Sequence, residues 1–163
     1  NMENLAYQIS QIVLQPVLIG IYISFIYAIV EVGRMAALSW LRFQHTKPEE
    51  AQPGYPILNF FKTETTITLN EVEVFALKQL ETVRIVTRVT PMLGLIATLV
   101  PMGPALVALQ ENNTYAMGEH MAVAFTAVTI SLVAASLTFW VASIKKRWFA
   151  EELVEIEKQL GAN

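Results

Sequence analysis

The chain of 163 residues contains no cysteine and no aspartate, and only 15% of its residues are charged. Without cysteine, neither a disulfide framework nor a zinc site with thiolate ligands can form. No histidine or glutamate residues show the spacing of metal ligands, and no nucleophile is paired with a base. No basic cluster is interleaved with aromatic residues. We therefore expect no enzyme, no bound cofactor, no metal site and no nucleic-acid partner.

Apolar sequence is what the chain has in excess, since 54% of its residues are hydrophobic. Between Arg88 and Lys145 there is no lysine or arginine, and the only acids are Glu111 and Glu119. The polar run 110–114 divides this stretch into two apolar arms. Each arm exceeds the roughly 20 residues that a helix needs to cross the hydrocarbon core of a bilayer. Because backbone amides in lipid must bond within their own segment, the arms are predicted to form a transmembrane helical hairpin.

A further apolar run, Ile12 to Val30, predicts a first transmembrane helix at about 11–30. Proline and glycine residues interrupt 44–69, and Asn70 with Glu73 resembles a capping box at the start of the next helix. The sequence thus predicts an all-α membrane protein with three spans and long cytoplasmic helical extensions. The first expected part, 1–43, contains the first span and its cytoplasmic extension, and the second, 44–69, is a cytoplasmic loop. The third, 70–163, is a long helical hairpin with spans at about 89–109 and 120–144, followed by a C-terminal cytoplasmic helix.

The basic residues indicate the orientation of the chain in the membrane. All eleven lysines and arginines lie in 31–88 or in 145–163. Loops rich in lysine and arginine remain in the cytoplasm, so the N-terminus is predicted outside and the C-terminus inside. The N-terminus lacks the features of a cleaved signal peptide, so the first span is expected to be retained. We expect a multi-pass protein of the cell (inner) membrane.

Two charged residues, Glu31 and Arg34, follow the first apolar run directly. Their i, i+3 spacing places them on one side of a helix. They could form a buried functional pair or mark the boundary between membrane and water. We favour the boundary, because amphipathic sequence continues beyond them.

Small and hydroxylated residues occupy positions in the hairpin where a simple lipid anchor would carry leucine. At about 100° per residue, one side of the second span carries Thr90, Gly94, Ala97, Thr98 and Pro101. On the third span a strip of small residues lies roughly opposite a strip of hydroxyls. Residue types alone favour helix packing over an ion path. The predicted packing residues are Gly94, Ala97, Ala124, Ala127 and Ala135. The strip of small residues on the third span comprises Ala124, Ala127, Ser131, Ala135, Thr138 and Ala142. The strip of hydroxyls comprises Thr126, Thr129 and Ser136.

An apolar stripe also lies on the C-terminal helix, at Phe149, Leu153, Ile156 and Leu160. A helix in water needs something to cover such a stripe, and the helix at 70–88 or a neighbouring subunit could do so. Together with the small faces of the hairpin, this stripe predicts a homo-oligomeric ring.

The two spans of the hairpin resemble the MotA/TolQ/ExbB proton-channel family. P-M-L-G-L-I-A-T-L, Pro91 to Leu99, is similar to the family's P-x-L-G-L-x-G-T-V. The run from Ala124 to Ala135 is similar to A-L-x-x-T-A-x-G-L-x-x-A. Three spans resemble the ExbB/TolQ branch, whereas MotA-type stators have four, and P-M-G-P from Pro101 is similar to archaeal members. The resemblance is specific over about 88–145.

The resemblance implies where ions would pass. Thr98 matches the second-span hydroxyl that lines the ion path in the family. The matching threonine of the third span falls on Val128, and Ser131 replaces the glycine that follows. Thr129 or Ser131 could supply the second hydroxyl, and the sequence leaves that choice open.

Neither span of the hairpin carries a titratable side chain within the membrane, whereas a proton crossing a dry core needs one. In the family, an aspartate on a single-span ExbD/TolR-type partner does this work inside a ring of five ExbB-type subunits. The resemblance implies the same partner and pentamer here, with H⁺ as the translocated ion and Na⁺ as the alternative. The expected function is a channel or motor subunit that uses the ion gradient for transport or mechanical work across the envelope. A non-conducting scaffold and a small-substrate transporter subunit are the alternatives.

Overall fold

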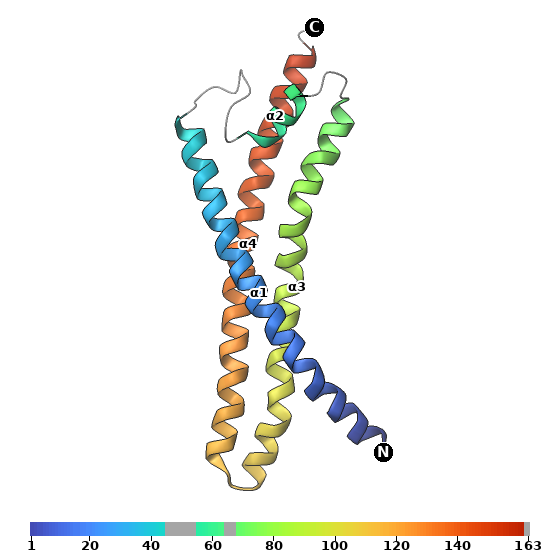
Figure 1. Cartoon of the computed structure of the whole chain (residues 1–163), viewed down its shortest axis with the longest axis vertical. Coiled ribbons are helices and arrows are strands. Elements are labelled where there is room, and N and C mark those ends of the chain that lie inside the picture. Colours follow the sequence, from blue (N-terminus) through green and yellow to red (C-terminus); the bar gives the residue numbers. More distant parts are fainter. Residues whose placement is uncertain (45–54, 64–67, 162–163) are drawn as a thin grey trace. The chain divides into compact units, whose positions relative to one another are not determined.

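The structure, a computed structural model, describes residues 1–44, 55–63 and 68–161. Within these ranges it has four helices and no strand: α1 (Met2–Gln44), α2 (Pro56–Thr63), α3 (Leu69–Gln110) and α4 (Thr114–Gly161), shown in Figure 1. The helices α1, α3 and α4 are each long and apolar enough to cross a membrane. This confirms the three predicted apolar helices, and the chain is a multi-pass membrane protein whose described part is built from helices.

The chain divides into two compact units, and each long helix contributes to both. The first unit comprises Asn1–Ile29 and Val86–Leu137, and the second comprises Val30–Ile85 and Thr138–Asn163. The first unit therefore contains most of the apolar sequence, whereas the second contains ten of the eleven lysines and arginines, all except Arg88.

Small side chains form the centre of the first unit. Its buried cluster joins Val17 and Ile21 of α1 to Ala97 of α3 and Ala127 of α4. Alanine at the centre allows helix backbones to approach closely, which favours association in lipid, where no hydrophobic force drives helices together. Larger side chains then close the edges of this contact: Leu18, Leu93 and Ile130.

Two neighbouring asparagines make the tight turn between α3 and α4. Asn112 has a φ of 57°, a left-handed conformation that asparagine tolerates better than most residues. The Asn113 amide donates to the Ala108 carbonyl at 2.8 Å, which satisfies the end of α3. The Asn113 side chain then accepts from the Ala116 amide at 3.1 Å and caps the start of α4. The polar run predicted to reverse the chain does so within one turn.

The second unit has a conventional apolar core built from α2, α3 and α4. Phe149 and Ile156 of the C-terminal stripe are buried there, and Leu153 is partly buried against them. Of the two predicted partners for the stripe, the helix at 70–88 is therefore the one that covers it within the chain. Leu160, the last residue of the stripe, is 43% exposed. The buried members of this core are Ile57, Val72, Ala76, Leu80, Phe149 and Ile156.

Two local predictions for this unit differ from the structure. The stretch 44–69 was expected to be irregular, but α2 occupies Pro56–Thr63. Proline is well suited to the first position of a helix, where its missing amide is not needed. The helix α3 begins at Leu69, and Thr68, whose hydroxyl accepts from the Glu71 amide at 3.4 Å, takes the capping position predicted for Asn70. The prolines at 48 and 53 lie outside the described residues.

Candidate functional site

The helices α3 and α4 lie very close together at Gly94 in the first unit. A Cβ atom placed on Gly94 would overlap the Ser131 hydroxyl and lie 2.8 Å from the Ser131 Cβ. Ser131 is fully buried, and its hydroxyl donates to the Val128 carbonyl at 2.8 Å. The two helices can therefore pack this closely only with glycine at position 94.

Thr98 lies one helical turn from this contact. Its hydroxyl donates to the Gly94 carbonyl at 2.8 Å, and its side chain is partly buried. A threonine bonded back to its own helix keeps acceptor capacity on its oxygen. The Thr98 hydroxyl is thus bonded to the carbonyl of Gly94, the residue at which α3 contacts α4.

Thr129 lies on a different side of α4, which is exposed in the single chain. Its hydroxyl donates to the Phe125 carbonyl at 2.7 Å, and the Ser136 hydroxyl donates to the Leu132 carbonyl at 2.7 Å. These four residues follow one another at spacings of four, three and four, the pattern of a seam that packs against another helix. We call Phe125, Thr129, Leu132 and Ser136 the outer seam of α4. Phe125 is 58% exposed and Leu132 52% exposed, so no described residue covers this seam.

The small residues predicted to pack are all buried in the single chain. Gly94 and Ala97 of α3 are buried, as are Ala124, Ala127 and Ala135 of α4. Ser131 and Thr138, which lie on the same strip of α4, are also buried. The strip of small residues therefore forms the inner face of α4, and the hydroxyls at 129 and 136 form part of its outer face.

Thr90 is a third residue on the side of the second span that carries Gly94 and Thr98, one helical turn before Gly94. It is fully buried in the first unit, and its oxygen has no hydrogen-bond partner among the described residues. Leaving a buried hydroxyl without a partner is unfavourable, and in proteins such groups usually meet water or an ion. The sequence predicted the side of the helix on which Thr90 lies, but it gave no sign that this hydroxyl is buried without a partner among the described residues.

Glu31 lies at the centre of a cluster of three charged residues in the second unit, together with Arg34 and Lys145. This carboxylate is buried, with 3% of the residue exposed. It accepts from Lys145 Nζ at 2.8 Å and from Arg34 Nη1 at 3.2 Å. The sequence predicted the pairing of Glu31 with Arg34 at a membrane boundary but missed Lys145. The available signal was that Glu31 and Lys145 both follow directly on the end of an apolar run.

A second buried ion pair joins α1 to α4 within the same unit. Arg42 Nη2 lies 3.2 Å from Glu152 Oε1, and the two side chains are only 11% and 2% exposed. The guanidinium also lies over the rings of Tyr55, at 4.3 Å, and Trp148, at 4.5 Å. Burial lowers the pKa of Arg42, and the nearby Glu152 carboxylate opposes that shift. No spacing rule links these four residues, so the sequence did not predict the contact.

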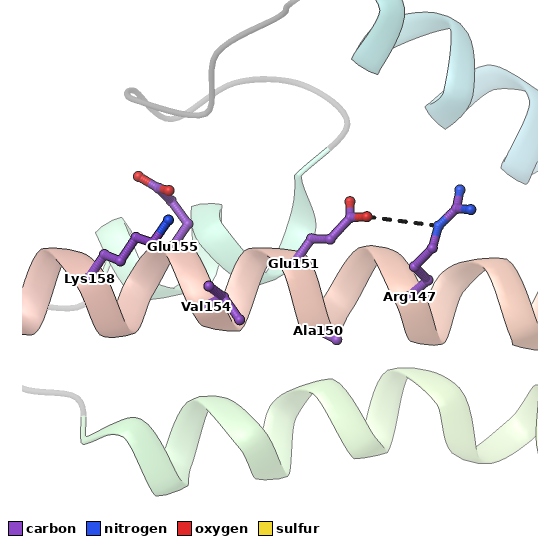
Figure 2. Close-up of a pocket in the computed structure, with 6 residues that line it drawn as sticks. All are labelled: Arg147, Ala150, Glu151, Val154, Glu155 and Lys158. Carbon is purple, nitrogen blue, oxygen red and sulfur yellow. Dashed lines mark ion pairs between the residues drawn. The ribbon is translucent and has the colours of Figure 1, made fainter.

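The face of α4 that is exposed in this unit carries a third ion pair, which is open to solvent and not buried. Figure 2 shows Arg147 and Glu151 one turn apart, with Arg147 Nε 3.8 Å from Glu151 Oε1. Their side chains are 67% and 62% exposed, so the pair contributes little to stability. This pair therefore serves as a control for the two buried clusters.

Comparison with known proteins bears on both units. A family model described as the MotA/TolQ/ExbB proton channel family matches residues 51–158, more than half of the chain. No curated protein and no solved structure matches the chain significantly. The matched range contains the turn between α3 and α4, the Gly94–Ser131 contact and the outer seam.

Proposed function

The chain belongs to the MotA/TolQ/ExbB proton channel family, and on this basis we propose that it is the channel subunit of an ion-driven motor. Such a subunit uses a transmembrane ion gradient to drive transport or mechanical work across the envelope. The observation that carries the proposal is the Thr98 hydroxyl bonded to Gly94, the residue at which α3 contacts α4, in a membrane hairpin of this family. The translocated ion is proposed to be H⁺, with Na⁺ as the alternative.

The titratable group of the path is proposed to come from a second protein. The apolar stretches of α3 and α4, at about 89–109 and 120–144, contain no aspartate, glutamate, lysine or arginine. Hydroxyl groups can relay a proton but do not titrate near neutral pH. A single-span partner of the ExbD/TolR type, with an aspartate within the membrane, would supply the missing acid.

The hydroxyls proposed to line the path are those of Thr98 and Thr129. Both are bonded to their own backbone, at 2.8 Å and 2.7 Å, so their oxygens can still accept a hydrogen bond from a protonated carboxyl. Ser131 is buried against Gly94, which supports a role in packing instead. The exposed outer seam offers a surface on which another transmembrane helix can pack.

The complex is proposed to be a ring of five copies, by analogy with the family. Large apolar side chains remain more than half exposed on every long helix, among them Ile26, Leu95 and Leu132. Lipid covers some of this surface, and neighbouring copies are proposed to cover the rest.

Ion flux into proteoliposomes tests the path. With the Asp-bearing partner, Thr98→Val is expected to lower flux roughly tenfold, the equivalent of one lost hydrogen bond of about 1.4 kcal/mol. Thr138→Val is the matched control, because Thr138 is fully buried and the substitution again replaces only a hydroxyl by a methyl. The subunit alone is expected to conduct poorly.

Full conduction by the subunit alone would contradict the need for a partner. A silent Thr98→Val with a blocked Thr138→Val would show that the path runs elsewhere. No flux from any combination would favour the non-conducting scaffold.

The proposed orientation follows from the confinement of basic residues to 31–88 and 145–163. It places the N-terminus outside and the C-terminus in the cytoplasm of a cell membrane. A fluorescent reporter that matures only in the cytoplasm should therefore be active after Asn163, and alkaline phosphatase at the same position should not. An active phosphatase fusion there would reverse the topology.

A further inference from the structure

The cavity beside the Glu31 cluster lies entirely within the second unit, where all four helices contribute to its walls. Its volume is about 380 Å³. Arg34 and Lys145 line it, and Gln79 adds an amide. Ala37, Leu41 and Phe149 provide apolar walls. The cavity thus combines cationic donors and an amide with space for a small polar group.

The charges around this cavity do not balance. Arg34 and Lys145 carry two positive charges and share the single negative charge of Glu31. Glu31 engages one nitrogen of Arg34, whose side chain is 70% exposed and has five N–H donors in all. Lys145 is held on one side by Glu31 and has three donors. The cluster therefore has a net charge of +1, which one monovalent anion would balance.

The position of the cluster along the helices indicates where that anion would come from. The apolar run of α1 ends at Val30 and that of α4 ends at Ile144, directly before Glu31 and Lys145. Arginine and lysine at the ends of membrane spans lie at the level of the lipid headgroups. Basic pockets between helices at this level bind the headgroups of anionic lipids.

We propose that this cavity binds the headgroup of an anionic phospholipid. The phosphodiester accepts from Arg34 and Lys145 and brings the cluster to charge balance. The remainder of the headgroup occupies the cavity, within reach of the Gln79 amide, and the acyl chains lie in the adjacent leaflet. The site is independent of ion conduction and needs no hydroxyl of the hairpin.

Native mass spectrometry of the full chain in detergent tests the site, with phosphatidylglycerol and phosphatidylcholine as probes. Phosphatidylglycerol is expected to stay bound, and Arg34→Gln is expected to weaken its binding roughly tenfold through loss of a charge-assisted contact. Arg147→Gln is the matched control, because Arg147 is 67% exposed, pairs with one carboxylate and lies outside the cavity. It is expected to bind phosphatidylglycerol like the unaltered chain.

A second variant tests the cavity separately from the charge. Ala37→Phe leaves every charge in place but fills the space, and Ala37 is exposed, so the larger side chain does not disturb the core. It should also weaken binding of phosphatidylglycerol. The proposal is overturned if Arg34→Gln binds as tightly as Arg147→Gln, if Ala37→Phe has no effect, or if phosphatidylcholine binds equally well. It is also overturned if inorganic phosphate alone displaces the lipid, since the site would then select a free anion.

Discussion

Glu152→Ala is expected to destabilise the second unit by about 3–5 kcal/mol, the cost of leaving a buried charge without its partner. Arg42 is held there at 11% exposure between two aromatic rings, and Glu152 is its ion-pair partner at 3.2 Å. The measurement is denaturant or thermal unfolding of the full chain in detergent, followed by a probe of helical structure.

The neighbouring residue provides the control for this substitution. Glu151 has the same side chain and lies on the same helix. Its Oε1 atom, however, lies 3.8 Å from Arg147 Nε, and both side chains are mostly exposed. Glu151→Ala should therefore change stability by no more than about 0.5 kcal/mol. Joint replacement of Arg42 and Glu152 by leucine should cost less than Glu152→Ala, because it removes both charges from the interior. Equal effects of Glu151→Ala and Glu152→Ala would contradict the buried pair.

Gly94→Ala is expected to force α3 and α4 apart and to abolish flux with the partner. The new methyl would lie 2.8 Å from the Ser131 Cβ, whereas carbon atoms in contact normally lie 3.5–4.0 Å apart. Rotation of the Ser131 hydroxyl cannot relieve the overlap, because the Cβ stays in place. Overpacking of this kind typically costs about 1–3 kcal/mol, which exceeds the roughly 1 kcal/mol that alanine gains over glycine in a helix.

Exchange of the two small residues tests whether the clash is local. Combining Gly94→Ala with Ser131→Gly moves the Cβ from one helix to the other and should restore much of the lost stability. Gly118→Ala is the control, since no atom lies within 4 Å of a Cβ at that position of α4. It should leave stability unchanged or raise it slightly. A harmless Gly94→Ala, or a double variant no better than the single one, would show that the helices do not depend on this contact.

The features that could be predicted from the sequence are those governed by local composition. Three apolar helices follow from the length of the runs and the absence of charge within them, because the bilayer imposes both requirements. The reversal at Asn112 and Asn113 follows from a short polar run between two such helices. The family resemblance rests on the runs Pro91 to Leu99 and Ala124 to Ala135, and the family match contains both runs.

The contacts that the sequence did not predict depend on the register between distant segments. Glu31 and Lys145 come from different helices, and nothing in the local sequence fixes which side chains face each other. The same holds for Arg42 with Glu152. Ser131 illustrates the limit inside the hairpin, since the sequence left packing and ion conduction open for it and did not predict its contact with Gly94.

The contact of Arg42 with Tyr55 has a consequence for the evolution of the chain. Arg42 precedes the connection from α1 to α2, and Tyr55 follows it, with the guanidinium 4.3 Å from the ring centre. Both ends of the connection are thus held by a side-chain contact, whatever its length. Lengthening a loop whose ends are already fixed costs only about 0.6 kcal/mol per doubling. Insertions between these two residues are therefore expected to leave the contact of Arg42 with Tyr55 in place during evolution.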